Sequence, residues 1–337
     1  MDKPTPFSKV FFEISGYCQA RCPYCCTGNR SLKSYPARFI PVKEFERGLQ
    51  YLLENGLADK FTRFDLYNWG DPFLHPKFQD ILRILSSKKT KYRLSTNAGI
   101  YRKIPSGLQE GLTRLTITIP GFSQTSYNRV HRLPFEKVKM NIQRFADDLG
   151  PERLYITFLV FQFNLNEIWE AYSFFEKHGI QVHFTVAYLN GYTMSRKFLL
   201  GNMTVPNIKE IGRDLFLFYI EDLISSRPKK YVCPQFSILA LDEFCNVLTC
   251  CVVTKDHPDY NIGQLFNLRA EDIYNKKLNR SVCKECQHLG IDFWVQTPPD
   301  LSFLNRITGE GFSAREILKI ITLKIKKKLK KIRKIEN

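Results

Sequence analysis

Three cysteines within eight residues constrain this chain more than any other feature: Cys18, Cys22 and Cys25. They follow an apolar, β-prone run at residues 10–14, and a strand that leads into a short loop can point three thiolates at one centre. Three thiolates suit a cubane iron–sulfur cluster with one iron left free of protein ligands, whereas a fourth would close the site. An iron that the protein leaves open indicates chemistry or ligand binding.

Structural zinc and disulfide bonds are the competing interpretations of this loop. Structural zinc takes four nitrogen or sulfur ligands, and no fourth Cys or His stands at the usual offset. Cys26 directly follows Cys25, so we expect its side chain to point elsewhere. Thiols three and four residues apart pair poorly, and the sequence shows no secretory features, so we prefer the cluster to a disulfide.

The loop resembles the signature of the radical S-adenosylmethionine (radical SAM) superfamily, which is written C-x3-C-x-aromatic-C. Tyr24 is the aromatic residue, and the resemblance places it among the cofactor-binding residues. The resemblance implies a [4Fe–4S] cluster whose free iron chelates the amino and carboxylate groups of S-adenosylmethionine. It also implies reductive cleavage of this cofactor to methionine and a 5′-deoxyadenosyl radical, which abstracts hydrogen from a substrate.

Length and composition bound the remaining alternatives. The chain has 337 residues, of which 44% are hydrophobic and 14% aromatic, so it can hold one large domain with or without a smaller one. No apolar run approaches the roughly 20 residues of a membrane span, and no signal-peptide segment is evident, so we expect a cytoplasmic protein. Ten clustered cysteines in that compartment indicate metal ligation.

Strand-like and helix-like segments alternate after the cysteine loop. The predicted strands lie at residues 63–67, 91–94, 115–119, 155–161 and 181–188, and the predicted helices at 41–55, 77–88, 135–149 and 166–178. This alternation predicts an α/β fold with a parallel sheet and right-handed crossovers. Six such units resemble the partial (βα)6 barrel of radical SAM enzymes, which we assign to residues 8–190. In barrels of this kind the active site lies at the carboxyl ends of the strands.

Two polar motifs at strand ends resemble cofactor-binding motifs of the superfamily. Gly70-Asp71-Pro72 resembles its Gly-Glu-Pro motif, in which glycine permits close backbone approach, proline stiffens the turn and the carboxylate faces an ammonium group. Asp in place of Glu shortens the reach, and an ordinary strand-to-helix turn also favours this tripeptide. Ser95-Thr96-Asn97 resembles the third-strand motif that meets the ribose or carboxylate, although a helix N-cap uses the same residue types.

The later strand ends carry weaker patterns. Thr118 belongs to a pattern that resembles a fourth-strand Ser-x-Asp-Gly motif, and Pro120 replaces its Asp. Asn164 and Glu167 match a fifth-strand Asn-x-x-Glu pattern, for which we prefer a structural role at the start of a helix. The sequence singles out no catalytic acid or base. The candidates are Tyr67, His131, Arg132 and Tyr188.

A second cysteine group follows a helical linker at residues 191–230. Its C-x16-C…C-x2-C spacing resembles the C-terminal SPASM/twitch module of radical SAM enzymes, assigned here to residues 231–295. The resemblance implies one auxiliary [4Fe–4S] cluster with four ligands, Cys233, Cys250, Cys283 and Cys286. Relatives carry glycine where this chain has Cys245, so Cys245 or Cys251 could replace Cys250. A zinc ribbon is the alternative use of four thiolates.

A basic tail ends the sequence. From Arg315 onward ten Lys or Arg residues and two Glu residues contribute +8 to a formal net charge of +17. Apolar residues recur there at helical spacing, which predicts a basic amphipathic C-terminal helix over residues 313–337. Three surfaces suit its apolar stripe: the rest of the protein, an anionic membrane or nucleic acid. We rank nucleic acid last, because the lysines concentrate in one tail.

These features together predict a radical SAM oxidoreductase or modifying enzyme that receives electrons from a donor such as flavodoxin or ferredoxin. A closed four-cysteine cluster suits an electron conduit, and we therefore expect oxidation or another modification of a small polar substrate of sugar or amino-alcohol type. The first alternative is a maturase for a peptide or protein that a partner delivers, although we expect no peptide-recognition domain before a strand that starts near residue 9. The second is a non-catalytic metal-binding protein that binds nucleic acid.

Overall fold

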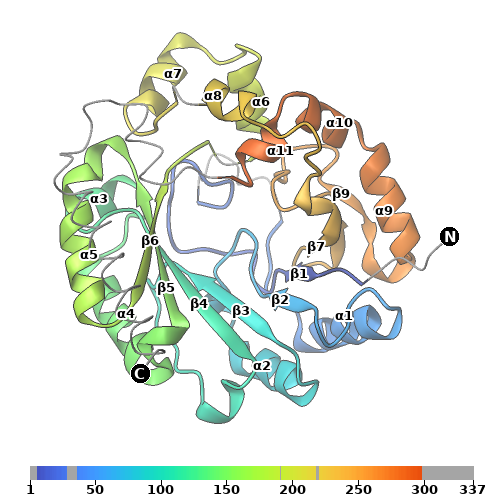
Figure 1. Cartoon of the computed structure of the whole chain (residues 1–337). Helices are drawn as coiled ribbons and strands as arrows, with labels where there is room; N and C mark the ends of the chain where they lie inside the picture. Colours follow the sequence, from blue (N-terminus) through green and yellow to red (C-terminus); the bar gives the residue numbers. More distant parts are fainter. Residues whose placement is uncertain (1–5, 29–35, 190, 218–219, 298–337) are drawn as a thin grey trace, which may run out of the picture.

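The computed structural model describes residues 6–28, 36–189, 191–217 and 220–297 (Figure 1). The basic helix predicted for residues 313–337 lies outside these ranges. Within them no helix is long and apolar enough to cross a membrane. The description below therefore concerns the two cysteine groups and the α/β structure that carries them.

In the described part of the chain one nine-stranded sheet runs in the order β6-β5-β4-β3-β2-β1-β7-β8-β9. The strands β1 to β7 pair in parallel, whereas β8 and β9 pair antiparallel. Their bounds are β1 Lys9–Phe12, β2 Arg63–Asp65, β3 Tyr92–Thr96, β4 Leu112–Ile119, β5 Leu154–Val160, β6 Gln181–Val186, β7 Ile238–Leu241, β8 Asn246–Leu248 and β9 Asn261–Gln264. The predicted α/β class with a parallel sheet is confirmed.

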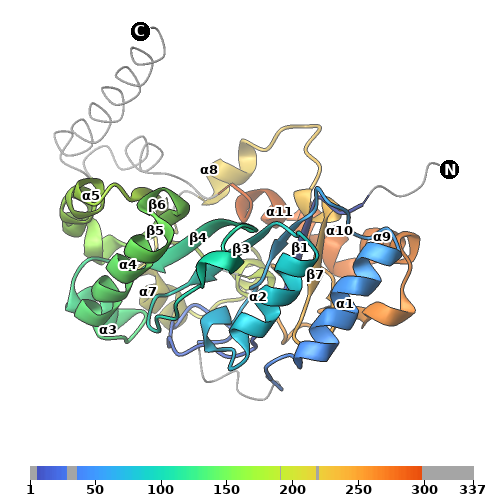
Figure 2. The same ribbon diagram turned by 90° about the horizontal axis from the view of Figure 1, so that it is seen from below.

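Helices between the parallel strands cover the outer face of the curved sheet (Figures 1 and 2). They are α1 Val42–Glu54, α2 Phe78–Ser87, α3 Gln124–Arg129, α4 Phe135–Leu149 and α5 Ile168–Lys177. In α1 the buried Phe45, Leu49 and Leu52 form one stripe, and the Phe45 ring lies 4.9 Å from that of Phe12 on β1. Each such buried side chain contributes roughly 1.5–3 kcal/mol.

The opposite face of the sheet carries polar, half-buried side chains. In β3 and β5 every second residue is buried, and the residues between them are half-buried. Ser95 of β3 stands opposite Thr116 of β4, and Thr118 of β4 stands opposite Thr157 of β5. A face lined with hydroxyl groups at the carboxyl ends of parallel strands is where an α/β fold binds its ligands.

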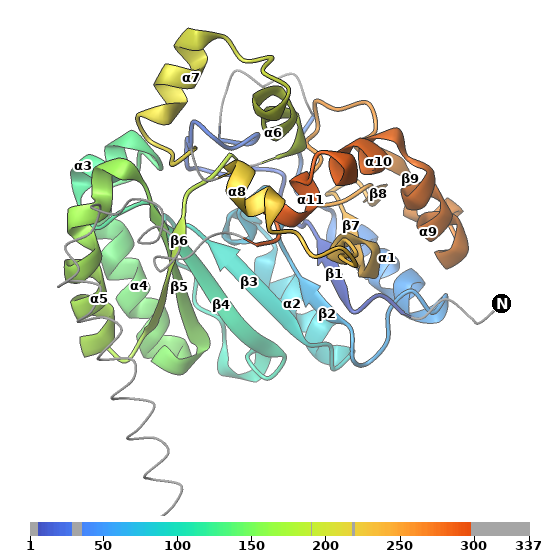
Figure 3. The ribbon, with the colours of Figure 1, turned by 45° about the horizontal axis from the view of Figure 1, so that its top comes forward.

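The C-terminal hairpin extends the main sheet, which the sequence did not predict. β7 pairs in parallel with β1, with Lys9 opposite Ile238 and Phe12 opposite Leu241. The remaining helices are α6 Tyr192–Leu199, α7 Val205–Gly212, α8 Ile220–Ser225, α9 Ala270–Asn279, α10 Ser281–His288 and α11 Ile291–Trp294. Figure 3 shows α6, α8, α10 and α11 together on one side of the strands, and an apolar cluster with Phe11 and Ile291 joins α6, α10 and α11 to the sheet.

Candidate functional site

The first three cysteines lie in the loop that follows β1. The backbone N–H of Arg21 donates to the His131 carbonyl at 3.0 Å, which ties the loop to the chain after α3. Within the loop Cys25 N donates to the Cys22 carbonyl at 3.3 Å and closes a turn. All three thiols, including that of Cys18, are partly buried and form no disulfide. The loop thus holds three free thiols at the carboxyl end of β1.

Burial and neighbouring groups shift the pKa values of these three thiols. Burial, and then the Asp71 carboxylate, raise the pKa of the Cys18 thiol to about 12. Burial also raises the pKa of Cys22, as do the neighbouring sulfurs of Cys25 and Cys18. The neighbouring Cys26 thiol lowers the pKa of Cys25 to about 6, and the Cys26 sulfur lies 3.9 Å from Thr27 Oγ1. The iron ions of a cluster would stabilise such thiolates.

Asp71 connects the cysteine loop to the end of β3. Its carboxylate is buried, and Oδ2 accepts hydrogen bonds from Thr96 Oγ1 at 2.8 Å and from Gln19 Nε2 at 3.4 Å. Gln19 Nε2 also donates to Asn97 Oδ1 at 2.7 Å, and Asn97 Nδ2 donates to Cys18 Sγ at 3.4 Å. Burial raises the pKa of Asp71, whereas these hydrogen bonds lower it. The buried Asp71 carboxylate therefore links the cysteine loop to the end of β3 through hydrogen bonds.

Gly70 brings the turn after β2 into direct contact with the cysteine loop. A Cβ atom at this position would lie 1.8 Å from the Ser15 carbonyl oxygen, so glycine is required by the close backbone approach. The next residue, Asp71, donates its N–H to the Tyr17 carbonyl at 2.8 Å. Pro72 then opens a short, buried 3-10 helix. The two segments that the sequence singled out as ligand-binding are thus packed against each other.

Residues 12–175 match the sequence model of the radical SAM superfamily. The chain carries a radical SAM domain. Members of this superfamily are enzymes, and this protein is therefore an enzyme. The domain implies a [4Fe–4S] cluster and S-adenosylmethionine as its cofactors, which agrees with the free thiols and the polar strand ends described above. A comparison with curated protein sequences found no match.

Solved structures with a similar fold include two radical SAM enzymes. The crystal structure of Streptococcus suis SuiB bound to precursor peptide SuiA superposes with a TM-score of 0.55 over 86% of this chain and 71% of that chain, at 16% sequence identity. The structure of anSMEcpe with bound AdoMet gives a TM-score of 0.53 over 83% of this chain and 79% of that chain, at 14% identity. At this level of identity the likeness concerns the fold.

Other residues predicted to bind cofactor in the radical SAM domain lie on two sides of the loop. The Tyr24 hydroxyl donates to Asp214 Oδ2 at 2.6 Å, so this side chain joins the cysteine loop to the segment after α7. Ser95 and Thr118 lie on the half-buried face of the sheet, where Thr116 stands beside Ser95. Their hydroxyl groups are placed to line the inside of the radical SAM domain.

Asn164 and Glu167 stabilise a loop, in agreement with the structural role that we preferred. Asn164 Nδ2 donates to the Pro120 carbonyl at 2.7 Å. The Glu167 carboxylate accepts from the hydroxyls of Ser123 and Ser126, at 2.5 Å and 2.7 Å. Both side chains thus hold the connection between β4 and α3.

The four candidate acids and bases occupy different surroundings. Among the hydrogen bonds of the described residues, none joins two of these four. Tyr67 donates to Asp65 Oδ2 at 3.4 Å. His131 is buried, and burial lowers its pKa to about 4, so it is neutral at pH 7. Arg132 has a left-handed backbone with φ of 57°. Burial raises the pKa of Tyr188 to about 12.

Glu13 is a site residue that the sequence analysis missed. It is fully buried at the end of β1, and its Oε1 accepts hydrogen bonds from the N–H groups of Trp69, at 2.7 Å, and Gly70. Glu243, also fully buried, pairs with Lys255 Nζ at 2.8 Å. Burial, and then Glu243, raise the pKa of Glu13 to about 8. A lone carboxylate within the apolar run at 10–14 was the signal that could have identified it.

The raised pKa of Glu13 predicts that stability decreases as the pH rises from about 5 to about 8. Over this interval the folded protein keeps a proton on Glu13 that the unfolded chain has released, so the free energy of unfolding falls. Glu13→Gln should flatten this dependence, which urea unfolding of the apoprotein at several pH values measures. Glu136→Gln, at an exposed position, is the matched control. Identical slopes for wild type and Glu13→Gln would contradict the assignment.

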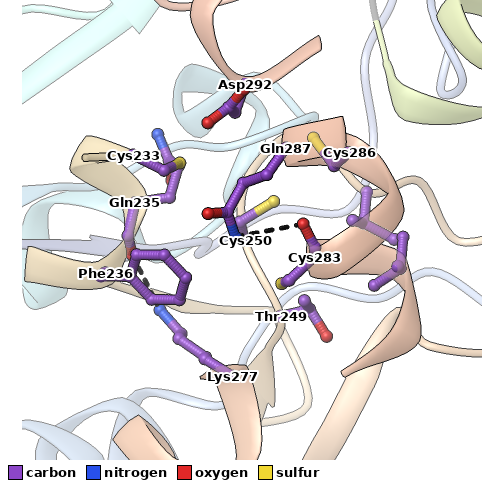
Figure 4. A pocket seen from close by; sticks show the side chains of 12 residues that line it. Cys233, Gln235, Phe236, Thr249, Cys250, Lys277, Cys283, Cys286, Gln287 and Asp292 are labelled. Atoms are coloured by element: carbon purple, nitrogen blue, oxygen red, sulfur yellow. Dashed lines mark hydrogen bonds between the residues drawn. The ribbon is translucent and has the colours of Figure 1, made fainter. Parts of the chain in front are cut away.

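The second cysteine group surrounds a cavity between η6 (Pro234–Ser237), the end of β8, and the helices α9 and α10 (Figure 4). All four sulfur-bearing residues that we predicted as auxiliary ligands line it: Cys233, Cys250, Cys283 and Cys286. The last two lie three residues apart on α10, which places them on one face of that helix. Burial raises the pKa of Cys233 to about 11 and that of Cys283 to about 12.

The two alternative ligands, Cys245 and Cys251, do not line this cavity. Cys245 is buried in the main core and has a left-handed backbone with φ of 57°, a conformation that favours glycine. The Cys251 thiol donates to Gln235 Oε1 at 3.3 Å. The geometry therefore favours Cys250 as the fourth thiol.

In the described residues, no three His, Cys, Asp or Glu side chains are arranged to bind one shared ion. A cubane cluster does not need thiolates that meet at one ion, because each thiolate binds its own iron atom.

Proposed function

We propose that the protein is a radical SAM enzyme in which Cys18, Cys22 and Cys25 hold the [4Fe–4S] cluster that binds S-adenosylmethionine. The observation that supports this most is the hydrogen-bonded path from Cys18 through Asn97 and Gln19 to Asp71. It joins the thiol loop to the motifs at the ends of β2 and β3. When bound, the cluster would supply the electron that cleaves the sulfonium and yields a 5′-deoxyadenosyl radical.

The residues of this chain would orient and shield the cofactor. Gly70 lets the backbone of its turn approach closely, and backbone carbonyls there would receive the ammonium group because the Asp71 carboxylate is already hydrogen-bonded. Ser95 and Thr118 would offer hydroxyl groups to the nucleoside from the half-buried face of the sheet. Asn97 donates a hydrogen bond to the Cys18 sulfur, which would stabilise the thiolate.

We further propose that Cys233, Cys250, Cys283 and Cys286 hold an auxiliary [4Fe–4S] cluster. Four thiolates leave no iron open to a substrate, so this cluster would carry electrons between the substrate radical and an external acceptor or donor such as ferredoxin or flavodoxin. The common cavity that these residues line supports this assignment. The alternative is a zinc site, which would hold the same segments together without redox chemistry.

The proposed substrate is a small polar molecule of sugar or amino-alcohol type, which would be oxidised or otherwise modified after hydrogen abstraction. The hydroxyl-lined face of β3, β4 and β5 is suited to such a molecule. A second candidate is a peptide or protein substrate, because the SuiB structure with a similar fold holds a precursor peptide. Contact of the basic C-terminal segment with an anionic membrane stays a prediction.

Removal of the auxiliary cluster tests this division of roles. Cys283→Ala combined with Cys286→Ala should lower the iron content of the anaerobically reconstituted protein from about eight to about four atoms per chain. Formation of 5′-deoxyadenosine should continue without product formation. Iron and sulfide analysis with a 5′-deoxyadenosine assay measures both effects. Zinc at this site in the wild-type protein, together with full product formation by the double variant, would refute the electron-conduit role.

A further inference from the structure

Lys277 is a buried cation beside the four-cysteine cavity. It lies in α9 with 1% of its surface exposed and lines the cavity together with the four cysteines (Figure 4). Its Nζ donates to the carbonyls of Ile238 at 2.6 Å and Gln235 at 3.2 Å. The adjacent Lys276 is exposed, as lysine normally is. Lys277 is therefore held inside by the fold.

The anionic groups that act on Lys277 are cysteine sulfurs. An ammonium group is costly to bury unless an opposite charge compensates it, and two neutral carbonyls do not. Asp292 lines the same cavity, but its carboxylate pairs with Arg227 at 2.8 Å. Burial lowers the pKa of Lys277, and the sulfurs nearby raise it, in the order Cys250, Cys283, Cys251 and Cys233. Ionised thiolates would supply the opposite charge that compensates the buried ammonium group of Lys277.

We propose that Lys277 is a positioning residue whose fixed positive charge raises the reduction potential of the auxiliary cluster. This inference rests on the proposed function, in which Cys233, Cys250, Cys283 and Cys286 bind a [4Fe–4S] cluster. Reduction adds one electron to a centre that already carries the negative charge of four thiolates, and it breaks no bond. A nearby ammonium stabilises the reduced form more than the oxidised form, because Coulomb attraction grows with the negative charge.

Lys277 favours electron uptake in this arrangement. An auxiliary cluster that accepts an electron from a substrate radical works better when its reduced state is stabilised. A carboxylate in the same place would have the opposite effect, and a lysine on the surface would be screened by water and salt. Because Lys277 is buried, water and salt screen its charge little, and this single charge can shift the reduction potential of the cluster.

The experiment uses a full-length chain in which Cys18, Cys22 and Cys25 are replaced by alanine, so that the auxiliary cluster is the one observed. Lys277→Met and Lys277→Gln remove the charge, and glutamine keeps a hydrogen-bond donor. Lys277→Arg keeps the charge, and Lys284→Met removes an exposed charge from α10 as the control. Iron and sulfide content is measured first, and the midpoint potential then follows from a redox titration monitored by electron paramagnetic resonance.

The neutral variants should lower the equilibrium constant for reduction at least tenfold, which corresponds to 59 mV for a one-electron couple. Lys277→Arg and Lys284→Met should stay close to the parent. Unchanged potentials in Lys277→Met and Lys277→Gln at full iron content would overturn the inference, as would loss of iron in all three Lys277 variants, which indicates a structural role. Iron loss confined to the neutral variants supports the role of charge. A parent that binds zinc or no iron refutes the proposed function itself.

Discussion

Replacing Cys18, Cys22 and Cys25 together by alanine is expected to abolish formation of 5′-deoxyadenosine from S-adenosylmethionine. These thiols are the ligands that we propose for the cofactor-binding cluster. Among the described residues, Cys26 is the one further cysteine in their loop. The variant should keep about four irons per chain in the auxiliary site. Product analysis under reducing conditions, with iron and sulfide determination on the same sample, measures both quantities.

Cys26→Ala is the matched control for this experiment. Cys26 lowers the pKa of the adjacent Cys25 thiol, but it is not one of the proposed ligands. The single variant should therefore retain the cluster and cleave S-adenosylmethionine, at a reduced rate at most. Cleavage by the triple variant would show that the loop does not hold the reactive cluster.

Gly70→Ala is expected to reduce the rate of S-adenosylmethionine cleavage by about 100-fold, the scale of effect produced by a displacement of about 1 Å in an active site. The added Cβ would lie 1.8 Å from the Ser15 carbonyl oxygen and 3.0 Å from that of Tyr17. Both contacts are with backbone atoms, which cannot rotate aside as a side chain can. The turn must move away from the cysteine loop and weaken the hydrogen bonds that Glu13 and Asp71 make across this junction.

Gly107→Ala is the control, because nothing lies within 4 Å of a Cβ atom built at Gly107. The measurement is the rate of 5′-deoxyadenosine formation per cluster-loaded protein, together with the urea-induced unfolding of both apoprotein variants. A wild-type rate for Gly70→Ala would mean that the turn plays no part in cofactor binding. Equal losses in the two variants would indicate a general effect of glycine replacement.

The α/β class could be predicted because its signals are local. Alternation of strand and helix patterns located β2 to β6 and the helices α1, α2, α4 and α5 within a few residues, but it missed the short α3. The pairing of β7 with β1 could not be predicted, since strand partners far apart in sequence leave no mark on the periodicity of either segment. Spacing indicated both cysteine groups, and the cavity favours Cys250 over its two alternatives.

The polar residues inside the protein were the hardest to predict. Glu13 occurs as one charge within an apolar strand, and Lys277 occurs among other lysines of a helix that looks like a surface helix. Their roles depend on partners from other segments, the N–H groups of Trp69 and Gly70 in one case and the carbonyls of Gln235 and Ile238 in the other. Composition and periodicity describe a residue's own segment and not these partners.

The pairing of β1 with β7 has a consequence for the order in which the chain is assembled. Ser8 and Ser237, which are hydrogen-bonded beside this junction, are 229 residues apart in sequence. A ribosome that adds about 5–20 residues each second therefore finishes β7 many seconds after β1 has emerged. Until then the edge of β1 that pairs with β7 stays open. Contacts of such long range make the step that closes this part of the sheet slow.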